Sequence, residues 1–333
     1  MNRTPASRGG VSGAAPGGRL RRILTPKVLN RLRLVLTLLT FGVLGWYLHT
    51  RPRLDLASLH PRWGYFLGAC LCVAPALWLR AAAKWRMLLR GTAPAVTYGE
   101  AFRSYLGALA LGLVTPGRVG EFSRGLYLPH RGAQGWRGAG LVLIDNWLDF
   151  LAVLFWACLG WGLCFRAPGL MIGLGLALLF APVRFWLGVA DKVTAKLPSL
   201  RGFRDSSRQA LAAGEGVSRA DWIGSFAAAM LAYGLDWLQL SLLLSFLLPQ
   251  VPAPWHLAGM MALVTLANSF QVTLAGLGVR EGLSMLLLAR EGVGSEAAVA
   301  AVFLQSCLGQ FLPALAGLAV KPVALYAPED RAD

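Results

Sequence analysis

The chain has 333 residues, of which 56% are hydrophobic and 14% are charged, and its net charge is +16. A soluble domain has about a quarter of its residues charged, so this composition excludes an ordinary soluble enzyme and indicates a membrane protein. The positive charge does not indicate nucleic-acid binding, because the Arg residues flank the apolar segments, as they do on the cytoplasmic side of membrane proteins.

The chain divides into a short tail, a long apolar part and a second tail. Residues 1–31 are rich in Gly, Pro and Arg without apolar periodicity, so we expect a disordered basic tail. Residues 32–322 are expected to form one transmembrane domain, followed by a C-terminal tail at 323–333. The first apolar segment, 33–49, ends on bulky residues and not on a small-residue cleavage site, which predicts a retained anchor.

Segments long enough to cross a bilayer recur along the chain, since a spanning helix needs about 20 apolar residues. They are 33–49, 63–79, 138–164, 168–189, 222–248 and 296–320. Two further apolar segments, 98–116 and 256–275, each run into a Gly-rich turn and a short amphipathic piece. Each could cross fully or return as a re-entrant hairpin. The fold class is therefore all-α, a polytopic transmembrane helical bundle.

The distribution of positive charge favours the hairpin scheme. With a cytoplasmic N-terminus, about six full crossings and two re-entrant hairpins leave six of the 32 Lys and Arg outside. Eight full crossings would leave half of them outside. Because cytoplasmic loops are enriched in Lys and Arg, we predict the hairpin scheme in the cell inner (plasma) membrane, with both termini cytoplasmic.

The two Gly-rich turns are similar to each other. Residues 114–121 read VTPGRVGE and residues 272–281 read VTLAGLGVRE. Three crossings separate the two units, so a repeat would be inverted, as in transporters whose site lies near the middle of the membrane. The match is short and needs a gap, so a repeat and a chance similarity both stay open.

A basic segment lies between the two proposed repeat units, and two local signals predict helix starts. Residues 190–219 are rich in Lys and Arg and are expected to form a cytoplasmic loop that touches anionic headgroups. Ser218 and Asp221 predict a cap for the helix that follows. Thr97 and Glu100 predict a capping box at the start of the first hairpin.

Charged residues within apolar segments are costly and are candidates for function. In the first turn, glycines allow a tight bend, and free N–H groups with arginines could hold a phosphate. Alternatively, Arg118 and Glu121 pair with each other and pin the hairpin. The second turn has the same two interpretations. The candidate binding residues of the two turns are Arg118, Gly120, Glu121, Arg124, Gly276, Gly278, Arg280 and Glu281.

Three aspartates complete the candidate site. Asp145 and Asp149 are four residues apart and share a helix face, so they could bind a cation, relay protons or pair with an arginine such as Arg118 or Arg124. Of these roles, pairing is favoured. Asp236 is a further site candidate because a buried carboxylate is costly. The amides of the last helices are expected to hold helices together; they are Gln239, Asn268, Gln271, Gln305 and Gln310.

Other polar residues receive simpler interpretations. Arg80, Lys84 and Trp85 follow an apolar segment and are interpreted as an interfacial basic helix with an aromatic anchor. The five cysteines lie in apolar segments and the four histidines are scattered. We therefore expect no disulfide, metal or cofactor site, and no catalytic constellation is recognised.

Taken in order, these motifs resemble the lysylphosphatidylglycerol synthase transmembrane (flippase-like) family. They are Arg80…Lys84-Trp85-Arg86, Pro116-x-Arg118-x-Gly120-Glu121-x-x-Arg124, Asp145-Asn146-x-x-Asp149 and Gly276-x-Gly278-x-Arg280-Glu281. The resemblance covers roughly residues 30–322, and the second motif is its most specific part. The family usually has Glu-Arg-x-x-Asp at the third motif, so the role of that arginine does not carry over to Asn146.

The resemblance implies a membrane module that translocates lipids. No aminoacyl-transferase domain follows in this sequence, so lysyl-lipid synthesis is not expected. The leading hypothesis is a flippase for an anionic phospholipid or a lipid-linked sugar. The alternative is a non-catalytic subunit that supports a glycosyltransferase or synthase in envelope glycan or glycolipid synthesis. A membrane-embedded enzyme is the third hypothesis, for which catalytic spacing is lacking.

Overall fold

The structure, a computed structural model, describes residues 62–128, 135–164, 213–269 and 278–321, together with Gly42 and Trp46. Every regular element in this part of the chain is helical, which agrees with the predicted fold class. The predicted tails, helix 168–189, most of the loop 190–219 and all of the anchor 33–49 except Gly42 and Trp46 lie outside the described residues.

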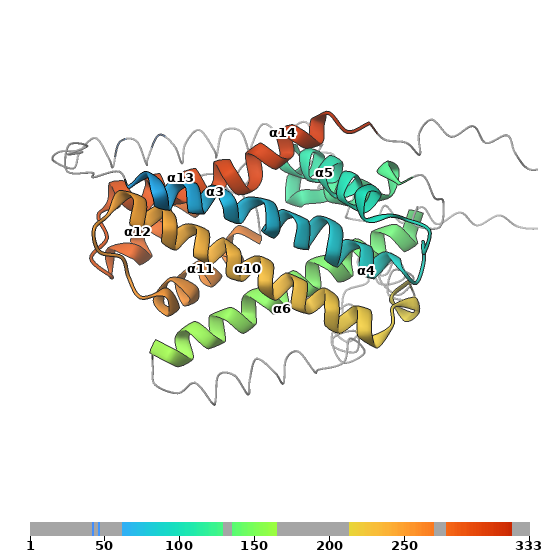
Figure 1. Cartoon of the computed structure of the whole chain (residues 1–333), viewed down its shortest axis with the longest axis horizontal. Coiled ribbons are helices and arrows are strands. Elements are labelled where there is room, and N and C mark those ends of the chain that lie inside the picture. The colour runs from blue at the N-terminus through green and yellow to red at the C-terminus, as the bar shows by residue number, and fades with distance from the viewer. Residues whose placement is uncertain are drawn as a thin grey trace, which may run out of the picture.

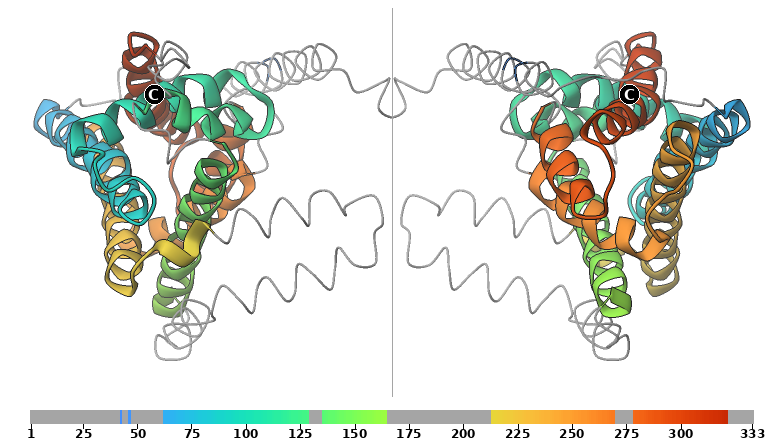
Figure 2. Two further views of the ribbon diagram at one scale, coloured as in Figure 1. Left: turned by 90° about the vertical axis from the view of Figure 1, so that its right-hand side faces the viewer. Right: turned by 90° about the vertical axis from the view of Figure 1, so that its left-hand side faces the viewer.

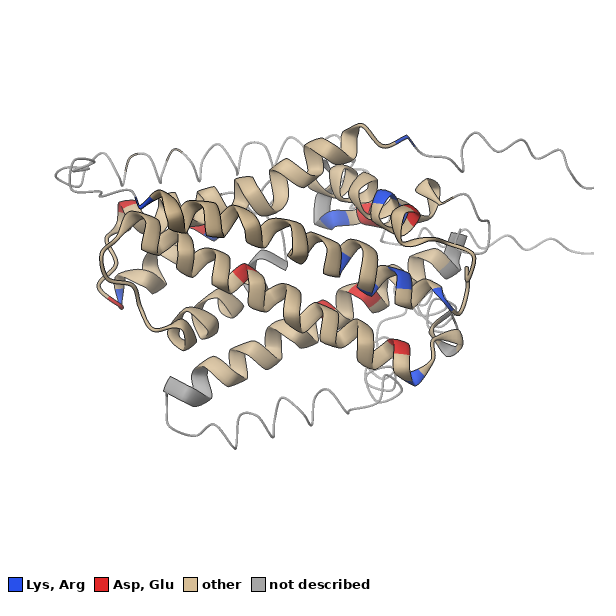
Figure 3. Cartoon of the chain, viewed as in Figure 1, with Lys and Arg blue, Asp and Glu red and all other residues tan. Residues whose placement is uncertain are grey.

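Within the described residues, four helical stretches have the length and composition to cross a membrane: Trp63–Leu89, Gly138–Gly160, Arg219–Leu247 and Ser295–Leu318. The first stretch combines α3 (Trp63–Trp78), the π-helical η2 (Leu79–Lys84) and α4 (Trp85–Leu89). The second lies within α6 (Gly135–Cys164), and the third is α10 (Arg219–Leu247). The fourth combines α13 (Ser295–Ser306), the π-helical η8 (Cys307–Phe311) and α14 (Leu312–Leu318). Most of the length of these helices carries no charge (Figure 3).

Two shorter helix pairs occupy opposite ends of the molecule (Figure 1). The first pair is α5 (Tyr98–Val114) and the 3-10 helix η3 (Pro116–Tyr127), which lie at the end where α4 stops. The second pair is α11 (Pro254–Ser269) and α12 (Val279–Ala289), which lie at the end where α10 stops. They correspond to the two segments that the sequence left open between a full crossing and a hairpin.

Local hydrogen bonds fix the chain at the end of the bundle where α4 stops and α10 begins. At the end with α5, Thr97 accepts from the Glu100 N–H and Glu100 accepts from the Thr97 N–H at 2.7 Å, which confirms the predicted capping box. Ser218 accepts from the Asp221 N–H at 3.1 Å, so the predicted cap of α10 is also confirmed. Just outside the α4 span, a hydrogen bond to Asp221 raises the pKa of the Arg90 guanidinium, and this pair joins α4 to the start of α10.

The bundle has an apolar core at each end. One cluster joins α10, α11, α12 and α13 through residues such as Leu240, Leu257 and Leu288. The other joins α4, α5 and α6 through residues such as Trp85 and Leu141. Seen end-on, α3 and α10 lie on one side, α6 on the other, and α5 with α14 across the top (Figure 2). Between the two apolar clusters the bundle is polar.

Small residues let the helices of the first pair approach closely, as in other membrane proteins. A Cβ atom at Gly120 would lie 2.3 Å from the Leu111 carbonyl carbon, so η3 rests directly on the backbone of α5. A Cβ at Gly317 would lie 2.0 Å from the Leu106 carbonyl oxygen, so α14 packs on α5 in the same way. The position of the first Gly-rich turn is therefore set by backbone contact.

Candidate functional site

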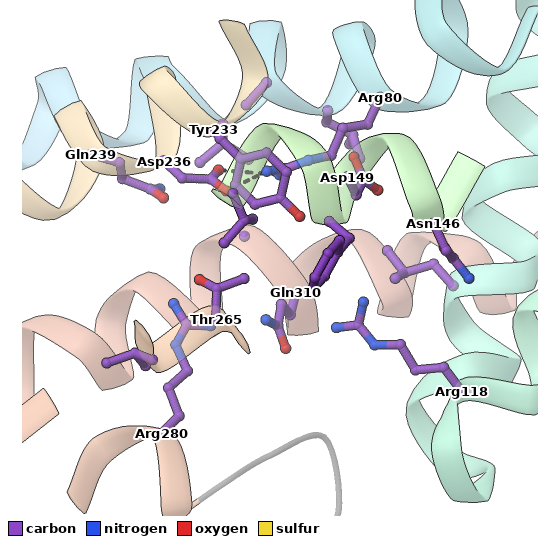
Figure 4. A pocket seen from close by; sticks show the side chains of 18 of the residues that line it. Arg80, Arg118, Asn146, Asp149, Tyr233, Asp236, Gln239, Thr265, Arg280 and Gln310 are labelled. Carbon is purple, nitrogen blue, oxygen red and sulfur yellow. Dashed lines mark hydrogen bonds and ion pairs between the residues drawn. The ribbon is translucent and has the colours of Figure 1, made fainter. Parts of the chain in front are cut away.

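A cavity of about 310 Å³ lies among the helices, and we refer to it as the central cavity. Its size falls in the range of small-molecule sites. Residues from α3, η2, α5, η3, α6, α10, α11, α12 and η8 line it. The polar ones are Arg80, Tyr105, Arg118, Asn146, Asp149, Tyr233, Asp236, Gln239, Thr265, Arg280 and Gln310. Figure 4 shows Arg118 and Arg280 reaching from opposite sides toward Gln310.

The first turn presents Arg118 from a strained backbone. Its φ angle is 57°, and it is the only residue other than glycine with a positive φ in the described part of the chain. Such a conformation costs about 1–3 kcal/mol and persists where the surroundings impose it. Here Thr115 accepts a hydrogen bond from the Gly120 N–H at 2.6 Å, which closes the turn. The Arg118 side chain is 40% exposed and lies 3.5 Å from Glu121.

The second turn presents Arg280 from the start of α12. Gly278 has a φ of 82°, which favours glycine at this position. Its N–H donates to Glu281 at 2.6 Å, and Ser306 donates to the same carboxylate at 3.3 Å, so Glu281 ties α12 to α13. Arg280 donates to the amide oxygen of Gln305 at 2.7 Å. Among the described residues, no carboxylate lies within 4 Å of its guanidinium.

Two details of the sequence-based hypothesis need correction here. The hypothesis expected free N–H groups at the two helix starts to hold a phosphate; of these, the N–H groups of Gly120 and Gly278 are not free, because they donate to Thr115 and Glu281. The pairing of Arg280 with Glu281, considered as an alternative, does not form: Glu281 accepts from Gly278 and Ser306, and Arg280 donates to Gln305. Of the described residues of the two turns, Arg118 and Arg280 line the central cavity.

A chain of alternating charges connects α6, η2 and η3, and we call it the charge chain. Its members, in order of contact, are Asp149, Lys84, Asp145, Arg124, Glu121 and Arg118. The Lys84 ammonium lies 2.6 Å from Asp149 and 2.9 Å from Asp145. Positive and negative members are equal in number, so the network is neutral, as buried charges in a membrane must be.

Arg124 holds the middle of the charge chain. Its guanidinium lies 2.5 Å from Asp145 and 3.5 Å from Glu121. It also lies 4.6 Å from the ring centre of Tyr105 and 5.0 Å from that of Trp85, at cation–π distance. The predicted pairing of the aspartate pair with an arginine is thus seen for Asp145.

A second polar network connects α10 with η2 and α12. Arg80 donates from both terminal nitrogens to the two carboxylate oxygens of Asp236, one of them at 3.1 Å. The Arg80 guanidinium lies 4.7 Å from the ring centre of Tyr233. Gln305 donates to the Asp236 carbonyl oxygen at 2.6 Å while accepting from Arg280. This amide therefore links the second turn to the Arg80–Asp236 pair.

The interpretation of Arg80 and Lys84 as an interfacial helix is wrong. The helix continues through a π-helical turn from Trp78 into α4, so both residues lie inside a spanning-length stretch. Lys84 is completely buried. The sequence held one signal for this: the three alanines between Arg80 and Lys84 leave room for neighbouring helices to approach.

The predicted site residues divide into three groups. Arg118, Asp149, Asp236 and Arg280 line the central cavity. Glu121, Arg124, Asp145, Gly120, Gly278 and Glu281 support the cavity from behind through the contacts described above. Gly276 and Gln271 lie outside the described residues, and nothing is described of the Asn268 side chain. Tyr105, Tyr233, Asn146 and Thr265 are cavity residues that sequence reasoning did not select.

A comparison with protein families gives a clear result. The family model described as "Lysylphosphatidylglycerol synthase TM region" matches residues 31–317, which covers the central cavity and both turns. Comparisons with curated proteins and with solved structures give no match.

Proposed function

This chain belongs to the lysylphosphatidylglycerol synthase TM region family, and from this premise we propose that it translocates an anionic phospholipid or a lipid-linked sugar across the inner (plasma) membrane. We propose a transporter and not an enzyme. The observation that carries the proposal is that Arg118 and Arg280, from helix pairs at opposite ends of the molecule, line one cavity.

Arginine is suited to this task. A phosphate that enters the membrane must exchange its water for other donors, and a guanidinium offers paired N–H groups that match phosphate oxygens. Among the described residues Arg280 donates to the amide of Gln305 and pairs with no carboxylate, and Arg118 is partly exposed with a carboxylate 3.5 Å away. Both can therefore turn to a ligand at a low cost in lost contacts.

The proposed topology makes α5–η3 and α11–α12 re-entrant hairpins. The first pair begins at Tyr98, which accepts from Arg90 at 3.4 Å. His256 at the start of α11 lies 2.8 Å from Glu291 just after α12, so the second pair begins and ends at the same place. With the segments 33–49 and 168–189 as further crossings, six crossings result. An inverted repeat would then place one hairpin in each half. In transporters built from inverted repeats, the substrate site lies between the halves.

In this mechanism the two arginines bind the lipid phosphate one after the other. The lipid headgroup enters the central cavity from one side and meets the arginine of the nearer hairpin, while its tails stay in the bilayer. Movement of a hairpin exposes the cavity to the other side, and the second arginine accepts the phosphate. The amide and hydroxyl side chains, among them Gln310 and Thr265, would bind the rest of the headgroup.

Transport into lipid vesicles tests the proposal. The purified protein is reconstituted with fluorescently labelled phosphatidylglycerol, and label reaching the outer leaflet is quenched by an added reductant. We expect wild type to raise the quenchable fraction above that of empty vesicles. Arg118→Gln with Arg280→Gln should lower the rate by about tenfold or more, since a charged hydrogen bond contributes roughly 1.5–3 kcal/mol.

The matched control is Arg290→Gln, which removes an exposed arginine at the other end of α12. It should transport at the wild-type rate. If wild type does not exceed empty vesicles with labelled phosphatidylglycerol or with a labelled polyprenyl-phosphate sugar, the transport function is wrong. Equal rates for the double variant and the control would remove the two arginines from the mechanism.

A further inference from the structure

The three arginines of the central cavity differ in what neutralises them. Arg80 donates to both carboxylate oxygens of Asp236 and stacks on Tyr233. Arg118 has one carboxylate at 3.5 Å, and Arg280 has an amide partner. The cavity therefore holds two arginines that are available to a ligand and one that is already occupied by an anion of the protein.

Asp236 is held in place from both sides. Its carboxylate is fixed by the paired hydrogen bonds from Arg80, and its backbone carbonyl accepts from Gln305 at 2.6 Å. It lies in the middle of α10, where the helix backbone fixes its position. Its side chain is nevertheless 30% exposed and lines the cavity, so a ligand in the cavity meets this negative charge directly.

We propose that Asp236 acts as a resident anion that sets the charge of the lipid that the cavity accepts. By holding Arg80, it leaves donors for one phosphate, between Arg118 and Arg280, and it repels a second. The ligand is then a lipid with a single phosphate, either a glycerophospholipid or a polyprenyl monophosphate sugar, and a lipid diphosphate is rejected. This inference rests on the proposed function, since it assumes that the cavity binds a lipid phosphate.

The physical reason is the short range over which charges act inside a protein. Two like charges about 4 Å apart in a partly buried site repel by several kcal/mol, whereas the same charges in water repel by about 1 kcal/mol. A second phosphate beside Asp236 would meet this repulsion. It would also have to compete for an arginine whose two nitrogens are bound to one carboxylate.

Two isoprenoid probes that differ only in the number of phosphates test the proposal. Binding of farnesyl phosphate and farnesyl diphosphate to the detergent-purified protein is measured by titration calorimetry. We expect wild type to bind the monophosphate about tenfold more tightly, a difference of 1.4 kcal/mol. Asp236→Asn frees Arg80, so its affinity for the diphosphate should rise about tenfold and the preference should disappear.

The control is Asp221→Asn. It removes an aspartate from the first turn of the same helix, α10, where Asp221 pairs with Arg90 at the end of the molecule. It should keep the wild-type preference. A second variant, Arg80→Gln with Asp236→Asn, replaces the pair by two neutral side chains and avoids an unpaired arginine. It should bind the monophosphate within about threefold of wild type, because Arg80 is not a ligand in the resting cavity.

The outcomes separate this inference from the function on which it rests. If neither probe nor short-chain phosphatidylglycerol binds wild type, both are wrong. If the probes bind wild type equally well, or if the double variant loses the monophosphate, the cavity binds lipid but Asp236 does not select its charge. Short-chain phosphatidylglycerol distinguishes the two lipid classes. If it binds more tightly than farnesyl phosphate, the ligand is a glycerophospholipid; if it binds more weakly, the ligand is a polyprenyl monophosphate. The inference requires both monophosphates to bind more tightly than the diphosphate.

Discussion

Lys84 has its ammonium group between the carboxylates of Asp145 and Asp149, with none of its side chain exposed. A buried charge of this kind is costly unless it is paired, and removal of one partner leaves the other without compensation. At the scale of single residues, the site is therefore built from groups whose charges are mutually dependent. Arg118 adds a second residue-scale feature, because its backbone is strained where its side chain enters the cavity.

Replacement of Lys84 should destabilise the protein strongly. Lys84→Met leaves Asp149 without its cation, and loss of one member of a buried pair typically costs about 3–5 kcal/mol. Lys84→Met with Asp149→Asn removes both charges and should recover much of the loss. Arg90→Gln removes a half-exposed arginine whose partner Asp221 keeps its hydrogen bond with Ser218, and should cost less than Lys84→Met, about 1 kcal/mol. Melting temperatures in detergent measure the series, and equal losses for Lys84→Met and Arg90→Gln would contradict the role given to the charge chain.

Arg118 allows strain and function to be separated. Arg118→Ala and Arg118→Gly both remove the guanidinium, and both should reduce lipid transport. Only glycine relieves the left-handed backbone, so Arg118→Gly should be more stable than Arg118→Ala by about 1 kcal/mol. Thermal unfolding and the vesicle assay together measure this. The strain argument fails if the two variants melt at the same temperature.

At the scale of elements, the two Gly-rich turns are held in different ways. The first lies on α5 through the backbone contact of Gly120 with Leu111, and Thr115 closes it. The second is held by Glu281, which caps Gly278 and reaches Ser306 on α13. Each turn is thus fixed to a neighbouring helix, and a movement of that helix would carry an arginine with it.

Gly120→Ala tests the first of these attachments. The new Cβ would lie 2.3 Å from a backbone carbon that cannot move without separating α5 from η3. Overpacking of this kind costs about 1–3 kcal/mol, and the shift of η3 should also reduce transport. Gly282→Ala is the control, because its Cβ would meet nothing within 4 Å and alanine in a helix adds about 0.5–1 kcal/mol. Opposite shifts in melting temperature are expected, and a neutral Gly120→Ala would show that the contact adapts.

At the scale of the whole molecule, the bundle keeps an apolar cluster at each end and a polar cavity between them. This arrangement suits a transporter, because each end can seal the cavity from one side of the membrane. It also places the exposed loop at 90–97 and the exposed loop at 290–294 at opposite ends of the described structure.

Cysteine labelling tests the topology of the whole molecule. In a background without the native cysteines, Ala95→Cys should react with a membrane-impermeant maleimide only after the cells are opened, because the scheme with two re-entrant hairpins puts this loop in the cytoplasm. Gln250→Cys, in the exposed loop between α10 and α11, should react in intact cells, whereas eight full crossings would put this loop in the cytoplasm. Labelling of both sites from outside, or of neither, would show that the hairpin scheme is wrong.

Several features of this protein were determined by its sequence alone. The four spanning-length helices of the described residues, the capping box at Thr97 and Glu100 and the cap at Ser218 were predicted correctly, because they depend on local composition and on hydrogen bonds three residues apart. The family was also recognisable from its motifs and their order. The need of Asp145, Asp236 and Arg280 for polar partners followed from the cost of charge in lipid.

Only the tertiary structure decided which residues are the polar partners of these charged side chains. Arg80 and Asp236 are 156 residues apart, and the aspartates that hold Lys84 come from a helix far along the chain. Contacts of this kind depend on how helices pack, and a hydropathy pattern says where a helix crosses but not which neighbour it meets. For the same reason Arg80 and Lys84 were misplaced at the interface. A π-helical turn continues the helix, and three aspartates from other helices, Asp145, Asp149 and Asp236, compensate charges that would otherwise exclude it from the membrane.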